Sequence, residues 1–455
     1  MQLRNIFLVL ALCAVVAVPA TAVTFEFITT PTNSLGGYDL TYDGSRGVAN
    51  FGGQIYLFDA AGNYTLINTI TPSVGGRTSI SGDGKTIVTN MQDDNGIGIP
   101  VIMRESDGWT IHPIELPAWN TVCDLTRASA YDVDGSGTRV TGLAWADGCT
   151  GKTFLWTEET GMQDLGTTRG SAISQDGTVI GGFETPQRRP AYWPIEGNIG
   201  LGAVLLHHEE DMGEVYDIST NGQVLVGTGL PYGFDPILTG YQAFRYEMGD
   251  TNFTLLGTTS GSPNDISKAL LIADNEVIIG VSGPSSINVK TFIWTPMIGM
   301  SSMKQYLIDA GVTELTNAHN LTWPKAFSED GSTFIGEYND LYGGWGYYRV
   351  DFGKTSPVQD VVRHTAKLTD VSPNPFNPMT TVSFSLDKRQ NAIVTVYDIA
   401  GRKVDVLADG EFEAGEHQLV WRGKDQSGRE MSSGSYIVRL ESGEGSDSRI
   451  ISLVR

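Results

Sequence analysis

Few segments of this sequence have the residue types and spacing that a phosphate or metal site requires. Residues 146–153 fit a permissive phosphate-loop pattern, but an apolar strand follows them where a phosphate loop needs a helix. Asp132, Asp134 and Ser136 resemble the start of a calcium loop, yet Leu143 stands where the glutamate of loop position twelve belongs. Hairpin turns explain both patterns, and we predict neither site.

Catalytic signatures are also absent from the sequence. Residues 207–211 read His-His-Glu-Glu-Asp, but neighbouring residues on one loop seldom converge on a single ion. The sequence contains no HExxH pair and no G-x-S-x-G elbow, and its other histidines have no recognisable nucleophile partner. We therefore predict no catalytic residue, no bound metal and no cofactor.

Two weaker signals for binding or hydrolysis remain open. Abundant Asp and Glu make a pair of glycosidase carboxylates conceivable, although the sequence does not single out the pair. Trp119, Tyr232, Tyr342 and Trp345 lie between expected strands, where exposed aromatic rings stack on sugars or peptides. The alternative is that these four side chains cap hydrophobic cores.

The composition restricts the class of protein that presents these residues. The formal net charge is −22, which argues against nucleic acid and against an anionic membrane surface, since Lys and Arg supply most phosphate affinity. There are 55 glycines and only 18% charged residues, a profile typical of a turn-rich β protein.

The N-terminus reads as a signal peptide covering residues 1–22. Arg4 precedes a 13-residue apolar run at 6–18, too short to span a membrane, and Ala20-Thr21-Ala22 places the cleavage between Ala22 and Val23. No other segment is long and apolar enough to span. Export leaves Cys123 and Cys149, which we predict to form a disulfide.

A repeated unit fills residues 23–355. Seven segments combine a turn with a β-branched run: 38–51, 78–90, 129–142, 171–182, 215–227, 265–280 and 326–336. Asp-Gly or Asn-Gly between apolar residues indicates a two-residue hairpin turn, which needs positive φ. The turn residues expected in that conformation are Gly44, Gly84, Gly135, Gly177, Gly222, Asn275 and Gly331.

An aromatic-rich strand follows each hairpin, and several units end in a further short strand, giving about four strands per 40–56 residues. Four-stranded blades at this period predict a seven-bladed β-propeller. The last unit lacks its fourth strand. We expect residues 24–29 to supply it beside residues 346–352 and so close the ring.

The units resemble the HAF-repeat family of extracellular proteins, most closely at KTFLWTEETGMQDLG (152–166) and SAISQDGTVIGG (171–182). The resemblance implies a propeller but brings no established catalytic residues. The stretch from Ser81 to Thr86 also resembles the aspartate boxes of sialidase propellers, which are structural turns.

A second module occupies residues 370–455, after a polar linker at 356–369. Its alternating strands are expected at 380–386, 392–399, 402–407, 416–423, 435–441 and 449–454. Short strands with turns every 8–12 residues predict a small immunoglobulin-like β-sandwich.

This module resembles two families through SPNPFNP (372–378), VYDIAGRKV (396–404) and WRGKDQSGREMSSGSYIVRL (421–440). One is the C-terminal type A sorting domain of type IX secretion, which implies transport across an outer membrane and removal. The other is the immunoglobulin-like domain of the flagellar hook-capping protein, which implies a retained spacer or contact module.

Together these patterns predict an all-β, secreted or cell-surface binding or scaffold protein. Its expected partners are the type IX secretion machinery or cell envelope, and a polysaccharide or surface protein at the propeller face. The alternative is an extracellular hydrolase or lyase acting on polysaccharide at the channel. Convergent carboxylates with perturbed pKa values would favour the enzyme.

Overall fold

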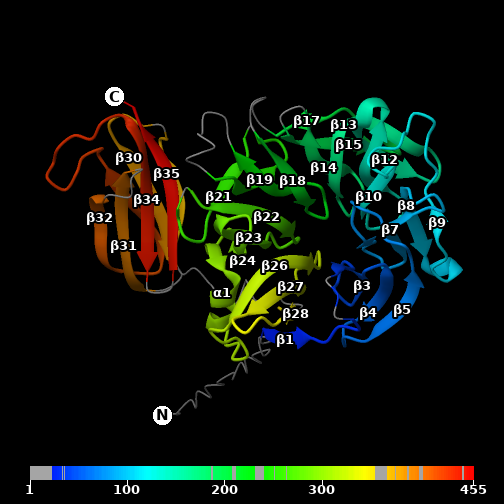
Figure 1. Ribbon diagram of the computed structural model, residues 1–455. Helices are drawn as coiled ribbons and strands as arrows, with labels where there is room; N and C mark the ends of the chain where they lie inside the picture. Colours follow the sequence, from blue (N-terminus) through cyan, green and yellow to red (C-terminus); the bar gives the residue numbers. More distant parts are fainter. Residues whose placement is uncertain are drawn as a thin grey trace, which may run out of the picture.

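The computed structural model describes residues 23–32, 34, 36–185, 188–206, 212–230, 240–250, 252–262, 264–353, 366–374, 376–386, 389–398, 403–442 and 445–454. In this part of the chain, seven blades surround a central axis and a separate C-terminal sandwich follows them (Figure 1). The predicted fold class is confirmed. The predicted signal peptide, the His-His-Glu-Glu-Asp segment, Tyr232 and most of the predicted linker lie outside the described residues.

Each blade is an antiparallel sheet whose first strand lies nearest the axis. Blades 1 and 2 contain β2 (Gly37–Leu40), β3 (Arg46–Phe51), β4 (Gln54–Asp59) and β5 (Tyr64–Thr69), then β6 (Ser79–Ile80), β7 (Thr86–Gln92), β8 (Gly98–Arg104) and β9 (His112–Pro113). Blades 3 and 4 contain β10 (Ala128–Val133), β11 (Val140–Ala146), β12 (Thr150–Thr157), β13 (Gly161–Ile173), β14 (Val179–Glu184), β15 (Arg189–Glu196), β16 (Ile199–Gly200) and β17 (Val204–Leu205).

The remaining blades follow the same plan. Blade 5 contains β18 (Met212–Ile218), β19 (Val224–Leu230), β20 (Gln242–Glu247) and β21 (Thr254–Gly257). Blade 6 contains β22 (Ile266–Ile272), β23 (Ile278–Ser285), β24 (Asn288–Thr295) and β25 (Gly299–Ser302), followed by helix α1 (Met303–Asp309). Blade 7 contains β26 (His319–Phe327), β27 (Thr333–Asp340), β28 (Trp345–Asp351) and, from the N-terminus, β1 (Thr24–Ile28).

Strand β1 closes the ring as the sequence predicts. It pairs with β28 in the register Thr24↔Asp351 to Ile28↔Tyr347, so the two ends of the propeller lie side by side at the bottom of Figure 1. Phe25 is buried and stacks on Tyr348 with ring centroids 5.4 Å apart. The ring is therefore held by hydrogen bonds and by apolar burial at the same seam.

In most blades, close packing requires a glycine at one position of the second strand. A Cβ on Gly227 would collide with the Glu214 carbonyl and with the Phe244 ring. The first strand bulges at this level, between Val215 and Asp217, which brings its backbone over the second strand. A Cβ would also meet a carbonyl and an aromatic ring at Gly142 and Gly280, and the Arg169 carbonyl at Gly182.

The repeated turns differ from the sequence prediction in their type. Ser81 donates its N–H to the Thr86 carbonyl (2.8 Å) and Gly84 donates to the Ser81 carbonyl (2.8 Å), so the loop holds four residues and not two. Positive φ is present at Gly44, Gly84, Gly177, Gly222 and Gly331, between 63° and 72°.

Gly135 and Asn275 lie in their turns but do not hold the position with positive φ. In blade 3 the residue with positive φ is Gly137 (72°) and not Gly135, because the Asp-Gly-Ser-Gly sequence places its second glycine where other blades have their only one. In blade 6 it is Glu276 (61°) and not Asn275, which instead accepts the Val277 N–H on its side chain (3.1 Å).

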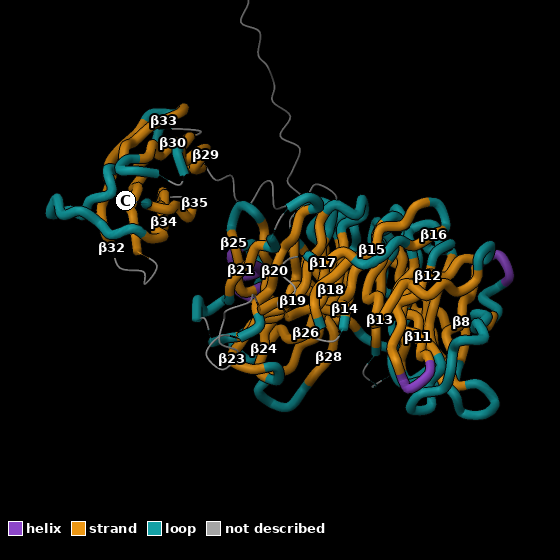
Figure 2. Tube along the Cα trace, turned by 90° about the horizontal axis from the view of Figure 1, so that it is seen from above, coloured by secondary structure: helices purple, strands orange, loops and turns teal. Residues whose placement is uncertain are grey.

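The C-terminal module consists of two facing sheets, seen apart from the propeller in Figure 2. Their strands are β29 (Ala366–Ser372), β30 (Thr380–Leu386), β31 (Gln390–Asp398), β32 (Lys403–Phe412), β33 (Gly415–Trp421), β34 (Gly434–Ser442) and β35 (Gly445–Leu453). Trp421 and Phe384 are buried between the sheets. Strand β29 was not predicted, and it begins inside the segment expected to be a linker. Across the described residues, no helix has the length and apolar character needed to span a membrane.

Candidate functional site

A central cavity of about 580 Å³ lies on the propeller axis. Its wall is made by the first strands of all seven blades, which are β2, β6, β10, β13, β18, β22 and β26. Loop residues 52–53 and 72–76 of blades 1 and 2 line one end. The repeated turns lie at the other end.

Three aspartates in this wall fasten alternate blades to their neighbours. Asp39 accepts the backbone N–H of Ile80 in the next blade (2.8 Å). Asp132 accepts from Ile173 (2.9 Å), and Asp217 accepts from Ile272 (2.8 Å) in the same way. Each also accepts the N–H of the residue that follows it. One Tyr-Asp-aliphatic tripeptide thus joins blades 1 to 2, 3 to 4 and 5 to 6.

Ser79 lies between two of these carboxyl groups. Its Oγ is 2.8 Å from Asp39 Oδ2 and 2.8 Å from Asp132 Oδ1. A serine hydroxyl carries a single proton and can donate to only one of the two oxygens. A proton on the other carboxyl, donated to Ser79, would satisfy both contacts, so this geometry favours one proton shared between Asp39 and Asp132.

The pKa values of the carboxyl groups in the cavity are raised, which agrees with a shared proton. Burial, reinforced by the charge of Asp39, raises the pKa of Asp132 to about 7. Burial likewise raises the pKa of Asp217 to about 7, with a contribution from Asp132. The pKa of Asp39 is raised mainly by burial, and that of Glu329 is raised by burial and then by the charge of Asp217. All four groups favour the neutral acid more than free carboxyls do.

The turns cross the axis at one end of the cavity. Gln175 Nε2 donates to Glu329 Oε1 (3.4 Å) and Thr220 Oγ1 donates to Glu329 Oε2 (3.2 Å), which links the turns of blades 4, 5 and 7. Backbone hydrogen bonds join successive turns, for example from Tyr42 to the Gly82 carbonyl (3.1 Å) and from Asp330 to the Tyr42 carbonyl (3.0 Å).

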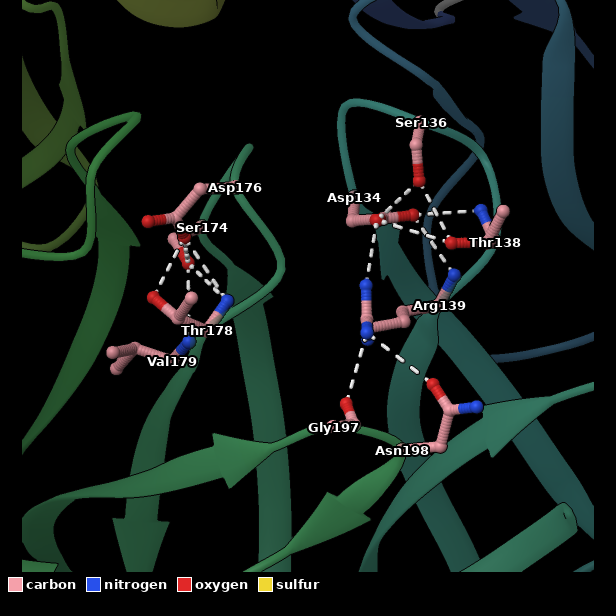
Figure 3. A network of polar contacts seen from close by, with 10 residues as sticks. All are labelled: Asp134, Ser136, Thr138, Arg139, Ser174, Asp176, Thr178, Val179, Gly197 and Asn198. Carbon is pink, nitrogen blue, oxygen red and sulfur yellow. Dashed lines mark hydrogen bonds and ion pairs between the residues drawn. The ribbon is translucent and has the colours of Figure 1, made fainter.

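The acids of the repeated turns serve the turns themselves. In blade 4, Ser174 Oγ donates to Asp176 Oδ1 (2.6 Å) and accepts the Val179 N–H (3.1 Å), as Figure 3 shows. In blade 3, Asp134 replaces the serine and accepts the N–H groups of Thr138 and Arg139 (both 2.8 Å). No group of three or more potential ligands suited to a metal ion occurs among the described residues.

The basic side chains of this region differ in whether they form ion pairs. Arg77 lines the cavity, is exposed, and forms no ion pair with any described carboxylate. Lys325 pairs with Glu337 (2.7 Å), while the fully buried Glu214 binds both Arg169 and Arg188. Against the larger effect of burial, the charge of Arg77 lowers the pKa of Asp39 and Asp217, and its guanidinium, held in no ion pair with a described carboxylate, can meet an anionic or polar group of a ligand.

The structure separates the aromatic residues singled out from the sequence. Trp119 is half-buried and packs against the core of blade 3, which matches the capping alternative. Tyr342 and Trp345 are exposed by 90% and 46% on the β27–β28 hairpin. None of these three lines the central cavity, so they do not form one site.

Cys123 and Cys149 form the predicted disulfide, with their Cα atoms 5.4 Å apart. It joins the connection between blades 2 and 3 to the short loop after β11. Asp124 and Leu125 beside it have positive φ, so the bond secures a tightly turned segment.

Sequence reasoning missed Asp39, Asp132 and Asp217 as cavity residues. The signal was present as Tyr-Asp-Leu, Tyr-Asp-Val and Tyr-Asp-Ile directly before three turns, in alternate units. In the sequence, Asp132 and Asp134 resemble ligands of one calcium loop. In the structure they point to different places, Asp132 to the cavity and Asp134 to its own turn.

Residues 376–446 match the FlgD Ig-like domain family. The β-propeller domain of the Trilobed protease from Pyrococcus furiosus is 10% identical over 70% of this chain and 97% of that chain, with a TM-score of 0.46. FlgD from P. aeruginosa is 26% identical over 20% of this chain and 67% of that chain, with a TM-score of 0.14.

PorZ from Porphyromonas gingivalis, described as a bacterial surface component of the type IX secretion system, is 11% identical. The similarity covers 92% of this chain and 70% of PorZ, with a TM-score of 0.26. No curated protein matches the sequence. The chain is thus a β-propeller protein that carries a FlgD-like Ig-like domain.

Proposed function

We propose that this chain is a secreted or surface-displayed binding protein without catalytic activity. Ligand recognition takes place at the open end of the central cavity, and the C-terminal domain directs export or attachment to the cell envelope. The domain limits we propose are 1–22 for the signal peptide, 23–355 for the propeller, and about 366–455 for the sandwich.

One observation carries the binding proposal. Both oxygens of Asp39, Asp132 and Asp217 accept backbone N–H groups, so these carboxyls are committed to holding blades together. A general acid or base must instead exchange its proton with a substrate. Arg77 lines the wall without an ion pair to any described carboxylate, which suits recognition of a polysaccharide or of a surface protein.

A glycan array and a peptide panel probed with the full chain test this proposal. Arg77→Ala is expected to weaken binding of any retained ligand by about tenfold, the usual loss when a charge-assisted hydrogen bond is removed. Arg104→Ala is the matched control, because Arg104 pairs with Glu158 outside the cavity. Equal affinity of both variants for the ligand would contradict recognition at the cavity.

The proposed role of the C-terminal domain is tested by mapping both termini of the native protein. Mass spectrometry after separating cells from medium distinguishes the two fates. A chain from Val23 to a residue near 353–370 means a sorting domain that is removed after type IX secretion. A chain intact to Arg455 means a retained immunoglobulin-like module that acts as a spacer or contact surface.

A second candidate function is an extracellular hydrolase or lyase acting on polysaccharide. It is favoured by the convergence of Asp132 and Asp217, both with a pKa raised to about 7, in one cavity. Product release from a polysaccharide, abolished by Asp217→Asn and unaffected by Arg104→Ala, would establish it. Binding without product release would leave the first proposal in place.

A further inference from the structure

A second pocket lies at the rim of the propeller, between blade 7 and blade 1. It has a volume of about 210 Å³ and is lined by β1, by the β4–β5 hairpin and by Arg349 of β28. Arg349 is only 8% exposed. Its Nη1 donates to the Ala60 carbonyl (2.8 Å), and within the described chain no carboxylate forms an ion pair with it.

Blade 5 shows what this repeat position looks like when it is neutralised. Arg245 follows Phe244, which faces Gly227, just as Arg349 follows Tyr348, which faces Gly336. Arg245, however, pairs with two carboxylates, Glu247 (3.1 Å) and Glu276 (3.2 Å).

Neither of the two equivalent positions supplies an ion pair to Arg349. Asp351 occupies the place of Glu247 but accepts the Gly353 N–H (2.8 Å). The turn position of Glu276 is Gly44 in blade 1. Hydrogen bonds from Asn63 and, more weakly, the charge of Arg349 lower the pKa of Asp59, but no described carboxylate contacts the guanidinium. Its remaining N–H groups are not among the buried atoms without a partner, so they face the pocket and can donate to an anionic ligand.

The pocket walls indicate the chemistry of that partner. Phe27, Ile28, Phe58, Tyr64 and Ile335 supply apolar and aromatic surface beside the cation. A planar guanidinium matches a carboxylate through two parallel hydrogen bonds. We propose that this pocket binds a carboxylate attached to a small apolar or aromatic group, either a free organic acid or the C-terminus of a peptide.

Two acidic residues lie near the pocket. Their charges weaken the binding of an anion, but neither forms an ion pair with Arg349. Glu26 faces Arg349 in the β1–β28 register but is exposed and forms no ion pair with it. Asp59 is exposed, and its Oδ1 accepts the N–H groups of Ala61 (2.9 Å) and Asn63 (3.0 Å). The site is distinct from the central cavity and goes beyond the proposed function.

Titration calorimetry of the full chain with benzoate and with its neutral isostere benzamide tests the site. Benzoate is expected to bind about tenfold more tightly than benzamide, because only the carboxylate makes charge-assisted hydrogen bonds. Arg349→Gln should abolish this preference, whereas Arg245→Gln, the matched control in blade 5, should keep it. Equal binding of the two probes, or benzoate binding that survives Arg349→Gln, overturns the proposal.

Further binding measurements identify the source of the carboxylate and keep the test decisive if a variant does not fold. A short peptide ending in a free phenylalanine carboxyl is compared with its amide. Tighter binding of the free peptide than of benzoate assigns the pocket to peptide termini, and the reverse assigns it to small acids. If Arg349→Gln is insoluble, Glu26→Gln removes a repulsive charge and should raise benzoate affinity severalfold; an unchanged affinity contradicts the site.

Discussion

Replacing Asp132 by Asn should remove part of the pH dependence of propeller stability. In the folded chain the pKa of Asp132 is raised to about 7 by burial and by Asp39, whereas an unfolded aspartate titrates at about 3.9. The folded state therefore holds this proton more tightly than the unfolded state. Its contribution to the free energy of unfolding is complete below the unfolded pKa and is lost as the pH rises through about 7.

The size of the effect follows from these two pKa values. Between pH 5 and pH 8 one such group lowers the free energy of unfolding by about 2.5 kcal/mol. Asp217 acts in the same direction with a pKa of about 7. Because the charges of Asp132 and Asp217 influence each other, the two together should amount to less than twice the single value.

Asparagine resembles the protonated acid in shape and charge but cannot ionise. At pH 8 it avoids the buried charge, and at pH 5 it costs about 1 kcal/mol because its amide group cannot accept the N–H of Val133 as well as that of Ile173. The variant should therefore be less stable than the natural chain at pH 5 and comparable or more stable at pH 8.

Urea unfolding at four pH values between 5 and 8 measures this difference. The propeller transition is followed by near-ultraviolet circular dichroism, and Glu158→Gln, at an exposed acid, serves as the charge-matched control. The control should keep the slope of the natural chain. If Asp132→Asn keeps the same slope too, the shared proton between Asp39 and Asp132 is not present and the reasoning from Ser79 fails.

Three other changes test the packing. Reducing Cys123–Cys149, which encloses a loop of 26 residues, should lower the free energy of unfolding by about 3 kcal/mol in urea titrations. Gly227→Ala forces a Cβ into a neighbouring carbonyl and should cost about 2 kcal/mol, whereas Gly37→Ala meets open space and should cost little. Phe25→Ala should cost about 3 kcal/mol and expose β28 to proteolysis, and an unchanged melting temperature would contradict the role of β1 as the closing strand.

The sequence predicted the repeat architecture well because each unit carries its own local signals. Turn residues and alternating strands are set by contacts within a few residues, so Gly84 and Gly177 could be placed from their neighbours alone. The closure by β1 followed from counting strands, since one unit lacked a partner that only the N-terminus could supply. Strand β29 was missed because its sequence, AKLTDVS, contains few large apolar residues, although Leu368 and Val371 are buried.

The candidate sites could not be predicted in the same way, because they depend on contacts between different blades. Ser79 approaches Asp39 and Asp132 across two blade boundaries, and nothing in the local sequence of any one unit shows that approach. The aromatic residues singled out from the sequence do not form one site, because Tyr342 and Trp345 share one hairpin whereas Trp119 packs into a core elsewhere.

One position of the repeated unit differs in its ion pairs between blades. Arg245 and Arg349 occupy the same position, and of the two only Arg349 forms no ion pair with a described carboxylate. An apolar residue such as Leu155 or Ile293 fills this position in other blades, so the fold itself does not require a cation there. This difference between equivalent positions is the reason for testing the rim pocket as the proposed carboxylate site.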